Sequence, residues 1–372
     1  MSSRRFRKRC LLAVSSVLVL LGLAEGTLRL FPGLLPVQLR RTIRADPRLG
    51  TASHPYIGHL NRATSETDPY GFPNDWPWPD TPAIITLGDS VTRGSGVEKA
   101  ATWTAILARA FPERGVVNLG LSGSGPQQYV RVYETFGVER RARLILVGFF
   151  AGNDFWDAAM FDRWLESGAG GNYLAWRDFG RPPSASLNLR QPKRLLARSA
   201  LWRAELAARS THLGSLLLYS ARRTGAPSGI EVYEAPDGTR LDLQPENLLR
   251  NARLAQPGAG VLTRVFASVQ RIHSLAHENG ASALVIFLPS KEEVYLPLLR
   301  VSSPDPAAPL RDALDDRGIP YLDVLEDFRH HAANGEVLFV ATDSPLPNAR
   351  GHALIAELVI SHLRQHAKRY GL

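Results

Sequence analysis

The sequence predicts an α/β fold with a parallel sheet, and three observations indicate it. Short apolar runs alternate with helix-like segments from residue 83 onward. The run at 143–150 is apolar from Leu144 onward, as a strand covered on both faces requires. Polar loops that contain glycine follow the first three runs, at the sheet edge where open α/β folds bind their ligands. The composition, with 44% apolar and 21% charged residues over 372 positions, is that of an ordinary globular protein.

The expected elements follow one another in a regular order. Apolar runs predict strands at 83–88, 116–120, 143–150, 283–288 and 320–324. Helical periodicity predicts helices at 98–111, 126–140, 259–279, 307–317 and 349–368. The alternation stops over 155–257, which we interpret as an insertion after the third strand and a candidate lid. Within it the sequence predicts a helix near 192–223 and a hairpin over 230–243 that turns at Asp237-Gly238.

The N-terminus has the pattern of a membrane-targeting segment. Residues 1–9 form a basic tail, and residues 10–31 contain an apolar run that is expected to be a membrane anchor or a cleavable signal. The basic tail predicts that the chain beyond the run lies on the outer, periplasmic or extracytoplasmic side, and is secreted if the segment is cleaved. Residues 32–82 are rich in Pro, Gly, Asp and Asn, which favours an extended linker or arm ahead of the domain at 83–372.

The charge distribution argues against nucleic-acid binding. The formal net charge is +9, but five basic residues lie within the first nine positions, and no basic stripe with interleaved aromatic residues follows. The single cysteine, Cys10, lies in the apolar run, so neither a disulfide framework nor a cysteine nucleophile is expected. No His, Asp and Glu spacing typical of a metal site is present, so we expect no metal and no other cofactor. The sequence does not predict the oligomeric state.

Three loops carry the residues with catalytic chemistry. They are Gly88-Asp89-Ser90, Gly120-Leu121-Ser122-Gly123 and Gly152-Asn153-Asp154, and each follows one of the first three strands. Because the carboxyl ends of parallel strands share one edge of the sheet, these loops are expected to converge. Ser90 is the candidate nucleophile, and its N–H with the Gly123 N–H and the Asn153 side chain would form an oxyanion hole. Asp89 and Asp154 are expected to hold the loops by bonds from side chain to backbone.

The three loops resemble the first three sequence blocks of the SGNH/GDSL hydrolases. Ser90 lies in Gly-Asp-Ser-Val-Thr-Arg-Gly, Gly123 in Asn-Leu-Gly-Leu-Ser-Gly, and Asn153 in Gly-Asn-Asp. The resemblance covers most of residues 70–372 and is closest to bacterial members with an N-terminal anchor. It implies a flavodoxin-like three-layer α/β/α sandwich, with Ser90 as the nucleophile and Gly123 and Asn153 as oxyanion donors. It also implies a small-molecule or glycan ester as the substrate.

The fourth block departs from the family pattern. The family carries Asp-x-x-His ahead of its last helix, whereas Leu346 stands three positions after Asp343 in this chain. Leucine cannot take a proton, and loss of the histidine from a Ser/His/Asp site can cost on the order of 10⁶ in turnover. Asp343 is retained as a candidate catalytic residue, with turn formation as its alternative role. His352 is the candidate replacement base ahead of His330 and His331, with a structural role as its alternative.

Three interpretations of the function remain open. The first is an SGNH/GDSL-type serine esterase that acts on an acyl or acetyl ester of an envelope component, with no base identified. A close variant of it is an O-acetyltransferase, in which a sugar hydroxyl replaces water as the acceptor. The second is a catalytically impaired relative that binds an acylated or glycan ligand in the envelope, which Leu346 favours. The third, an envelope scaffold without a ligand, rests only on the N-terminal segment.

Overall fold

The computed structural model of the chain divides into two units, and each is described by itself. The larger unit is Gly50–Arg181 with Pro227–Leu372, and the smaller is Met1–Leu49 with Pro182–Ala226. The residues that the structure describes are 2–31, 34, 51–113, 115–168, 170–179, 213–214, 216–217, 231–341 and 345–372. Most of the helix predicted near 192–223 therefore lies outside the described residues, as does Asp343.

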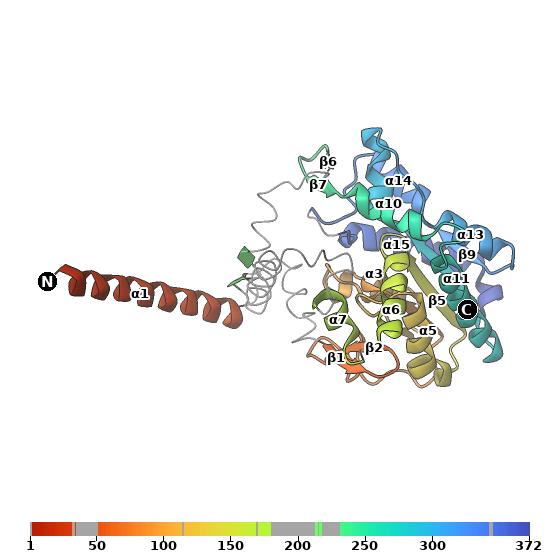
Figure 1. Ribbon diagram of the computed structural model, residues 1–372. Coiled ribbons are helices and arrows are strands. Elements are labelled where there is room, and N and C mark those ends of the chain that lie inside the picture. The colour runs from red at the N-terminus through yellow and green to blue at the C-terminus, as the bar shows by residue number, and fades with distance from the viewer. Residues whose placement is uncertain are drawn as a thin grey trace. The chain divides into compact units, whose positions relative to one another are not determined.

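A five-stranded parallel sheet forms the centre of the larger unit (Figure 1). The spatial order of the strands is β4-β3-β5-β8-β9, and each neighbouring pair is parallel. Numbered along the chain this is the order 2-1-3-4-5 of flavodoxin-like folds. The strands are β3 (Ile84–Gly88), β4 (Val116–Asn118), β5 (Leu144–Phe150), β8 (Ser282–Leu288) and β9 (Tyr321–Asp323). All five predicted strands are confirmed, each within two residues of its expected bounds.

Helices cover both faces of the sheet, which confirms the three-layer sandwich (Figure 1). One face packs against α5 (Pro126–Val132), α6 (Asp154–Ser167), α11 (Val261–Glu278) and α13 (Ala308–Asp315). The other face packs against α4 (Trp103–Ala110), α12 (Lys291–Tyr295), α14 (Leu325–Ala333), α15 (Ala349–Gln365) and α16 (Ala367–Tyr370). The helix predicted at 126–140 continues past α5 as a π-helical turn, Tyr133–Gly137, and a 3-10 turn, Val138–Arg140.

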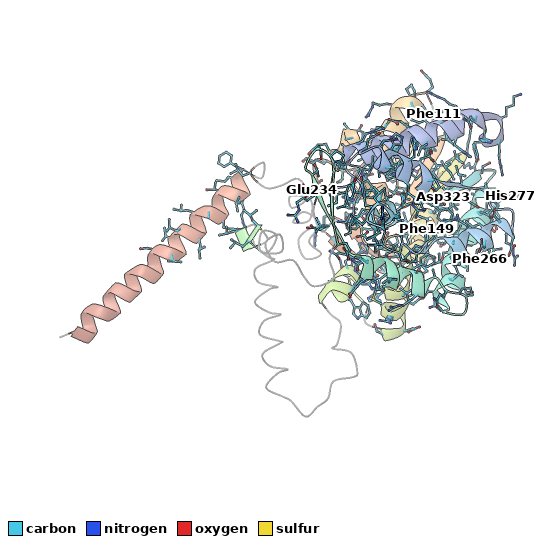
Figure 2. All side chains as sticks on the ribbon, turned by 90° about the horizontal axis from the view of Figure 1, so that it is seen from above. Phe111, Phe149, Glu234, Phe266, His277 and Asp323 are labelled. Carbon is cyan, nitrogen blue, oxygen red and sulfur yellow. The ribbon has the colours of Figure 1, made fainter. Side chains whose placement is uncertain are left out.

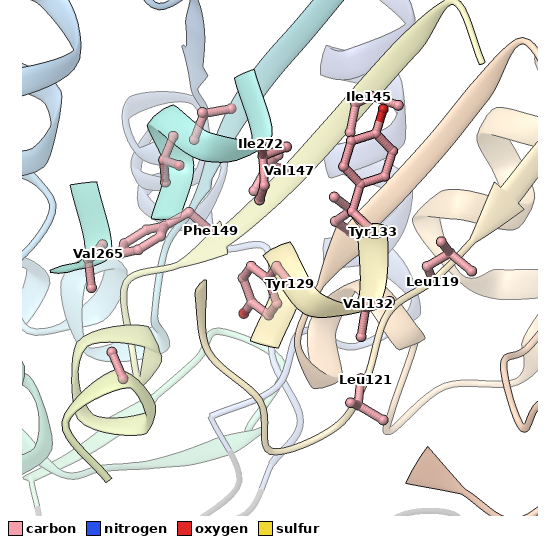
Figure 3. Packing of buried hydrophobic residues seen from close by; sticks show 14 of the residues in the cluster. Leu119, Leu121, Tyr129, Val132, Tyr133, Ile145, Val147, Phe149, Val265 and Ile272 are labelled. Carbon is pink, nitrogen blue, oxygen red and sulfur yellow. The ribbon is translucent and has the colours of Figure 1, made fainter. Parts of the chain in front are cut away.

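Each strand contributes side chains to the hydrophobic clusters on both faces of the sheet, because successive side chains of a strand point to opposite faces. Along β5, Leu146 belongs to the cluster of the α15 face, whereas Ile145, Val147 and Phe149 belong to the cluster of the α5 face. Figure 3 shows these three side chains in one cluster with Tyr129 of α5 and with Tyr133, which lies beside Ile145. Figure 2 places Phe149, which is 0% exposed, among the side chains of the interior. This two-sided burial explains why the sequence of β5 is apolar at every position.

Residues 51–82 are more ordered than the extended arm that the sequence predicted. Strands β1 (Thr51–His54) and β2 (Gly58–Asn61) pair as an antiparallel hairpin. Further along, the buried Asp68 carboxylate accepts hydrogen bonds from the Phe72 backbone N–H at 3.0 Å and from the Trp78 indole at 2.8 Å. The Pro- and Gly-rich composition therefore reflects tight turns held by side chains, and the segment belongs to the larger unit.

Much of the predicted insertion also belongs to the larger unit. The first helix of that segment, α6, is part of the sandwich, and it is followed by α7 (Tyr173–Phe179). The predicted hairpin is confirmed as β6 (Glu231–Glu234) and β7 (Arg240–Leu243), and α10 (Pro245–Leu254) follows it. Within 155–257, only Pro182–Ala226 falls in the smaller unit.

In the smaller unit, the described N-terminal segment is one helix, α1 (Ser2–Leu30). Its Arg29 guanidinium pairs with Glu25 at 2.7 Å, and the Leu213 backbone N–H donates to the other Glu25 oxygen at 2.8 Å. None of the helices in the described part of the chain carries an apolar stretch long enough to cross a membrane. The membrane span was predicted at 10–31. The side chains of residues 2–14 and 18 lie outside the described set, so part of that span is not described.

Candidate active site

Ser90 begins the short helix α3 (Ser90–Arg93) directly beyond the end of β3. Gly88 makes the sharp exit from the strand possible: a Cβ at this position would lie 2.8 Å from the Gly148 carbonyl oxygen of the neighbouring strand. Asp89 is the N-cap of α3, and its Oδ1 accepts the Val91 backbone N–H at 2.8 Å. The predicted loop-holding role of Asp89 is thereby confirmed. The Ser90 side chain lies at the end of a buried strand and is itself partly exposed.

The loop after β4 packs directly onto the Ser90 turn. The Leu121 backbone N–H donates to the Gly88 carbonyl at 2.9 Å. A Cβ at Gly120 would lie 2.4 Å from the Arg93 backbone nitrogen, so only glycine allows the loop to approach α3 this closely. The Asn118 side chain ties the two segments together by donating to the Thr92 carbonyl at 2.8 Å.

Gly123 lies on the same loop in a left-handed conformation, with φ +72°. No acceptor within the described part of the chain takes its backbone N–H. Its carbonyl is held by Arg177 of α7, whose NH1 atom donates to it at 3.1 Å and pairs with the buried Asp157 at 2.6 Å. The loop that carries the Gly123 N–H is therefore held in place by Arg177.

The third loop follows β5 and brings Asn153 to the first loop. The Asn153 side chain hydrogen-bonds to the Asp89 carboxyl group, and its Oδ1 atom is buried without a partner among the described residues. The loop is braced from α10, where the Asn251 amide donates to the Gly152 carbonyl at 2.7 Å. The same Asn251 side chain accepts the Trp156 backbone N–H at 3.1 Å. Asp154 accepts the Phe150 backbone N–H at 3.0 Å, as predicted for a residue that holds the loop.

The predicted convergence of the three loops is therefore observed. Strands β3 and β5 are neighbours, and the chain leaves them on opposite sides of the sheet, which is the topological switch point at which flavodoxin-like folds bind ligands. Ser90 follows β3 and Asn153 follows β5 at this switch point, with Gly123 on the adjoining loop. The three loops thus bring a serine hydroxyl, a glycine N–H and an asparagine side chain to the same edge of the sheet.

Leu346 stands where the sequence resemblance led us to expect a histidine. It lies in an irregular segment whose backbone pairs with residues 338–340: the Leu346 carbonyl accepts the Val340 N–H at 3.1 Å, and Phe339 forms a bridge with Pro347. A Cβ built on Gly96 would lie 3.4 Å from Leu346 Cδ1. Because Gly96 follows α3 by three residues, the leucine faces the nucleophile turn and presents an apolar group there.

The three candidate replacement histidines lie on α14 and α15. His352, on α15, is 0% exposed, and its Nδ1 atom accepts the Trp103 backbone N–H at the start of α4 at 3.3 Å. This contact is that of a histidine joining two helices, the structural role that the sequence left as an alternative. His331 on α14 hydrogen-bonds to Glu336, and its neighbour His330 is exposed. The hydrogen bonds described for His352 and His331 are with Trp103 and Glu336, and a role of His352 as the base stays a prediction.

Sequence reasoning missed three residues that reach the site from other elements. Arg177 and Asn251 come from within the predicted insertion, and His59 comes from β2. The His59 ring is fully buried, and its Nε2 donates to the Ser122 carbonyl at 3.0 Å. Burial lowers the pKa of His59 to about 3, so the ring stays neutral and acts as a hydrogen-bond brace. No local motif marks these residues, because only the tertiary fold brings them to the loops.

Solved structures of GDSL-family proteins and of esterases are similar to the chain in fold. A member of the lipolytic G-D-S-L family from Veillonella parvula is 14% identical, with a TM-score of 0.38, and the match covers 76% of this chain and 98% of that one. A GDSL-like lipase from Bacteroides thetaiotaomicron is 10% identical, with a TM-score of 0.34 and coverage of 76% and 87%.

A third similar structure is an acetyl xylan esterase, at 10% identity and a TM-score of 0.38, with coverage of 75% of this chain and 98% of that one. No family model and no curated protein matches the chain. The likenesses concern the fold, so the function is argued from the residues of the chain itself.

Proposed function

We propose that the chain is an SGNH/GDSL-type serine esterase that hydrolyses an acyl or acetyl ester on a small molecule or glycan of the cell envelope. The observation that carries this proposal is the meeting of Ser90, Gly123 and Asn153 at the switch point between β3 and β5. The envelope location rests on the sequence alone, through the basic tail at 1–9 and the apolar run at 10–31.

The proposed chemistry begins with attack of Ser90 Oγ on the carbonyl carbon of the ester. The tetrahedral oxyanion would then accept hydrogen bonds from the N–H groups of Ser90 and Gly123 and from the Asn153 amide, which together lower the barrier by several kcal/mol. Collapse of the intermediate releases the alcohol and leaves an acyl group on Ser90. Water, or a sugar hydroxyl in the acetyltransferase variant, takes that acyl group in the second half of the reaction.

A second candidate function is favoured by one observation, the apolar Leu346 against the Ser90 turn. Without the imidazole, the same site would bind an acylated or glycan ligand through its donors and leave the ester intact. The two candidates predict different results from one assay, because only the esterase needs the Ser90 hydroxyl for turnover.

The assay is hydrolysis of p-nitrophenyl acetate by the purified full chain and its Ser90→Ala variant. Ser361→Ala is the matched control, because Ser361 is exposed on α15 and away from the three loops. The proposal expects turnover in the unaltered protein and in Ser361→Ala, and only the uncatalysed background in Ser90→Ala. Equal rates in all three proteins would favour the binding protein instead.

A further inference from the structure

Asp89 lies at the centre of the hydrogen bonds that surround the Ser90 hydroxyl. Ser90 Oγ donates to Asp89 Oδ2 at 3.0 Å, while Asp89 Oδ1 accepts the Val91 N–H that caps α3. The Asn153 side chain also bonds to this carboxyl group. Asp89 is 0% exposed. Within the described residues, it is the only titratable side chain that hydrogen-bonds to the nucleophile.

The surroundings of Asp89 keep its carboxyl group available as a base. Burial raises the pKa of Asp89 to about 6, and the hydrogen bonds from Val91, Ser90 and Asn153 oppose that rise. A carboxylate with a pKa near 6 is a stronger base than an exposed one, and it is still ionised at neutral pH.

The titratable groups around Asp89 leave the negative charge on it. Asp154 is also fully buried, and its pKa is raised well above the usual range by burial and by the charge of Asp89. The Tyr129 hydroxyl donates to Asp154 at 2.7 Å, and burial raises the pKa of Tyr129 so that it stays protonated. Asp157 is paired with Arg177 at 2.6 Å. The pKa of Asp154 is thus shifted upward by burial and by the Asp89 charge, whereas Asp157 has Arg177 as its counter-ion.

We propose that Asp89 is the general base of the site, in place of the imidazole that Leu346 excludes. This proposal rests on the proposed esterase function. As Ser90 Oγ forms its bond to the ester carbonyl carbon, its O–H bond breaks and the proton passes to Asp89 Oδ2, while the carbonyl electron pair moves to the oxyanion. Collapse of the oxyanion breaks the bond to the alcohol, and the departing alkoxide takes the proton from Asp89. Water then attacks the acyl group, giving its proton to Asp89, which returns it to Ser90 Oγ.

The two oxygens of the Asp89 carboxyl group have different roles, and this difference suggests a variant that changes only one of them. One oxygen caps α3, and the other accepts the Ser90 proton. Asparagine is an equally good N-cap residue, so Asp89→Asn retains an oxygen for the Val91 N–H. Its amide nitrogen cannot take a proton from Ser90. The variant therefore separates the structural role of residue 89 from the catalytic one.

The test measures Ser90-dependent kcat/KM for p-nitrophenyl acetate in the full chain, with Ser90→Ala as the background. Four proteins are compared: the unaltered chain, Asp89→Asn, Leu346→His and the double variant. The proposal expects Asp89→Asn to lower kcat by about 10²-fold or more with little change in KM, because a general base contributes about 10²–10⁴-fold. In the Leu346→His background the same change should cost less than about 10-fold, because the imidazole takes the proton instead.

Equal losses in both backgrounds would overturn the proposal, because a residue that only positions Ser90 is needed with either base. Retention of the full rate by Asp89→Asn would also overturn it. If Leu346→His brings no gain, the pH profile decides: the rate of the unaltered chain should rise with pH through a pKa near 6, and Asp89→Asn should lack that rise. The same rise in both proteins would contradict the assignment. A rate no higher than that of Ser90→Ala in the unaltered chain would instead refute the esterase function.

Discussion

Leu346 lies against Gly96, with its Cδ1 atom 3.4 Å from the position that a Cβ on the glycine would take. The contact places the side chain at position 346 over the turn that follows the nucleophile helix. Position 346 is held there by backbone pairing with residues 338–340, in addition to packing of the leucine side chain against the core cluster of the α15 face. A different side chain at 346 should therefore occupy the same place.

The first prediction is that Leu346→His raises esterase activity. An imidazole at this position would add a second general base beside Asp89, so kcat/KM for p-nitrophenyl acetate should increase about 10-fold, less than the contribution of a first base. Leu346→Gln is the control, because it adds a polar group of similar size that cannot act as a base. An unchanged rate in a stable Leu346→His protein would show that the missing imidazole is not what limits the site.

The second prediction concerns Gly123 and separates backbone strain from crowding at the site. Gly123→Ala and Gly168→Ala both place alanine in a left-handed conformation, at φ +72° and +62°, which costs about 1–2 kcal/mol of stability. Only at Gly123 would the new Cβ collide, 2.7 Å from Leu174. Both variants should unfold at lower urea concentration than the unaltered chain, and only Gly123→Ala should also lose hydrolysis. Full activity in Gly123→Ala would remove Gly123 from the oxyanion hole.

The third prediction is that Asn251 supports both stability and turnover. Asn251→Leu would leave the Gly152 carbonyl and the Trp156 N–H without their partner, which should cost about 1–3 kcal/mol in the free energy of unfolding. Displacement of the loop that carries Asn153 should lower kcat more than it changes KM. Asn247→Ala, which removes a half-buried side chain one turn earlier on α10, serves as the control and should change both quantities little. A fully active Asn251→Leu protein would show that Asn153 needs no brace from α10.

The fourth prediction is a pH dependence of stability that arises from Glu293. Burial raises the pKa of Glu293 to about 8, above the usual value of 4.5. Between these two values the folded chain binds the proton and the unfolded chain does not, so this group makes stability fall as pH rises from about 5 to 8. The slope from one such group is at most about 1.4 kcal/mol per pH unit.

Urea unfolding of the unaltered chain and of Glu293→Gln at several pH values measures this slope. Ser290 caps the helix that contains Glu293, and its N–H and hydroxyl donate to the Glu293 carboxylate at 2.8 and 2.9 Å. A glutamine at 293 keeps an oxygen that can accept these bonds. Glu293→Gln should therefore flatten the fall, and Glu326→Gln, at an exposed position on α14, should not. An equal slope in all three proteins would mean that Glu293 is not the source of the pH dependence.

The sheet and the three loops could be predicted from sequence because their signals are local. Strands buried on both faces need continuous apolar runs, as at 144–150, and the loops at their ends need glycine and polar residues at fixed positions. The turn at Gly88, the close approach at Gly120 and the placement of Asn153 all follow from those runs.

The braces of the site could not be predicted, because they depend on contacts between distant segments. Asn251 and Arg177 reach the loops from a region whose pattern lacks the alternation of the sheet, and His59 comes from a hairpin hidden in a Pro- and Gly-rich stretch. For His352 the sequence left a base and a structural role open. Its burial and its contact with Trp103 follow only from the packing of α15 on α4.

The central claim is that Ser90 forms a covalent acyl intermediate, and acid quenching of the full chain during p-nitrophenyl acetate turnover tests it most directly. Mass spectrometry of the quenched protein should find an acetyl group on the peptide that contains Ser90, and Ser90→Ala should carry none. An unmodified Ser90 peptide, together with equal hydrolysis by Ser90→Ala and the unaltered chain, would contradict the claim and leave the three loops as a binding site.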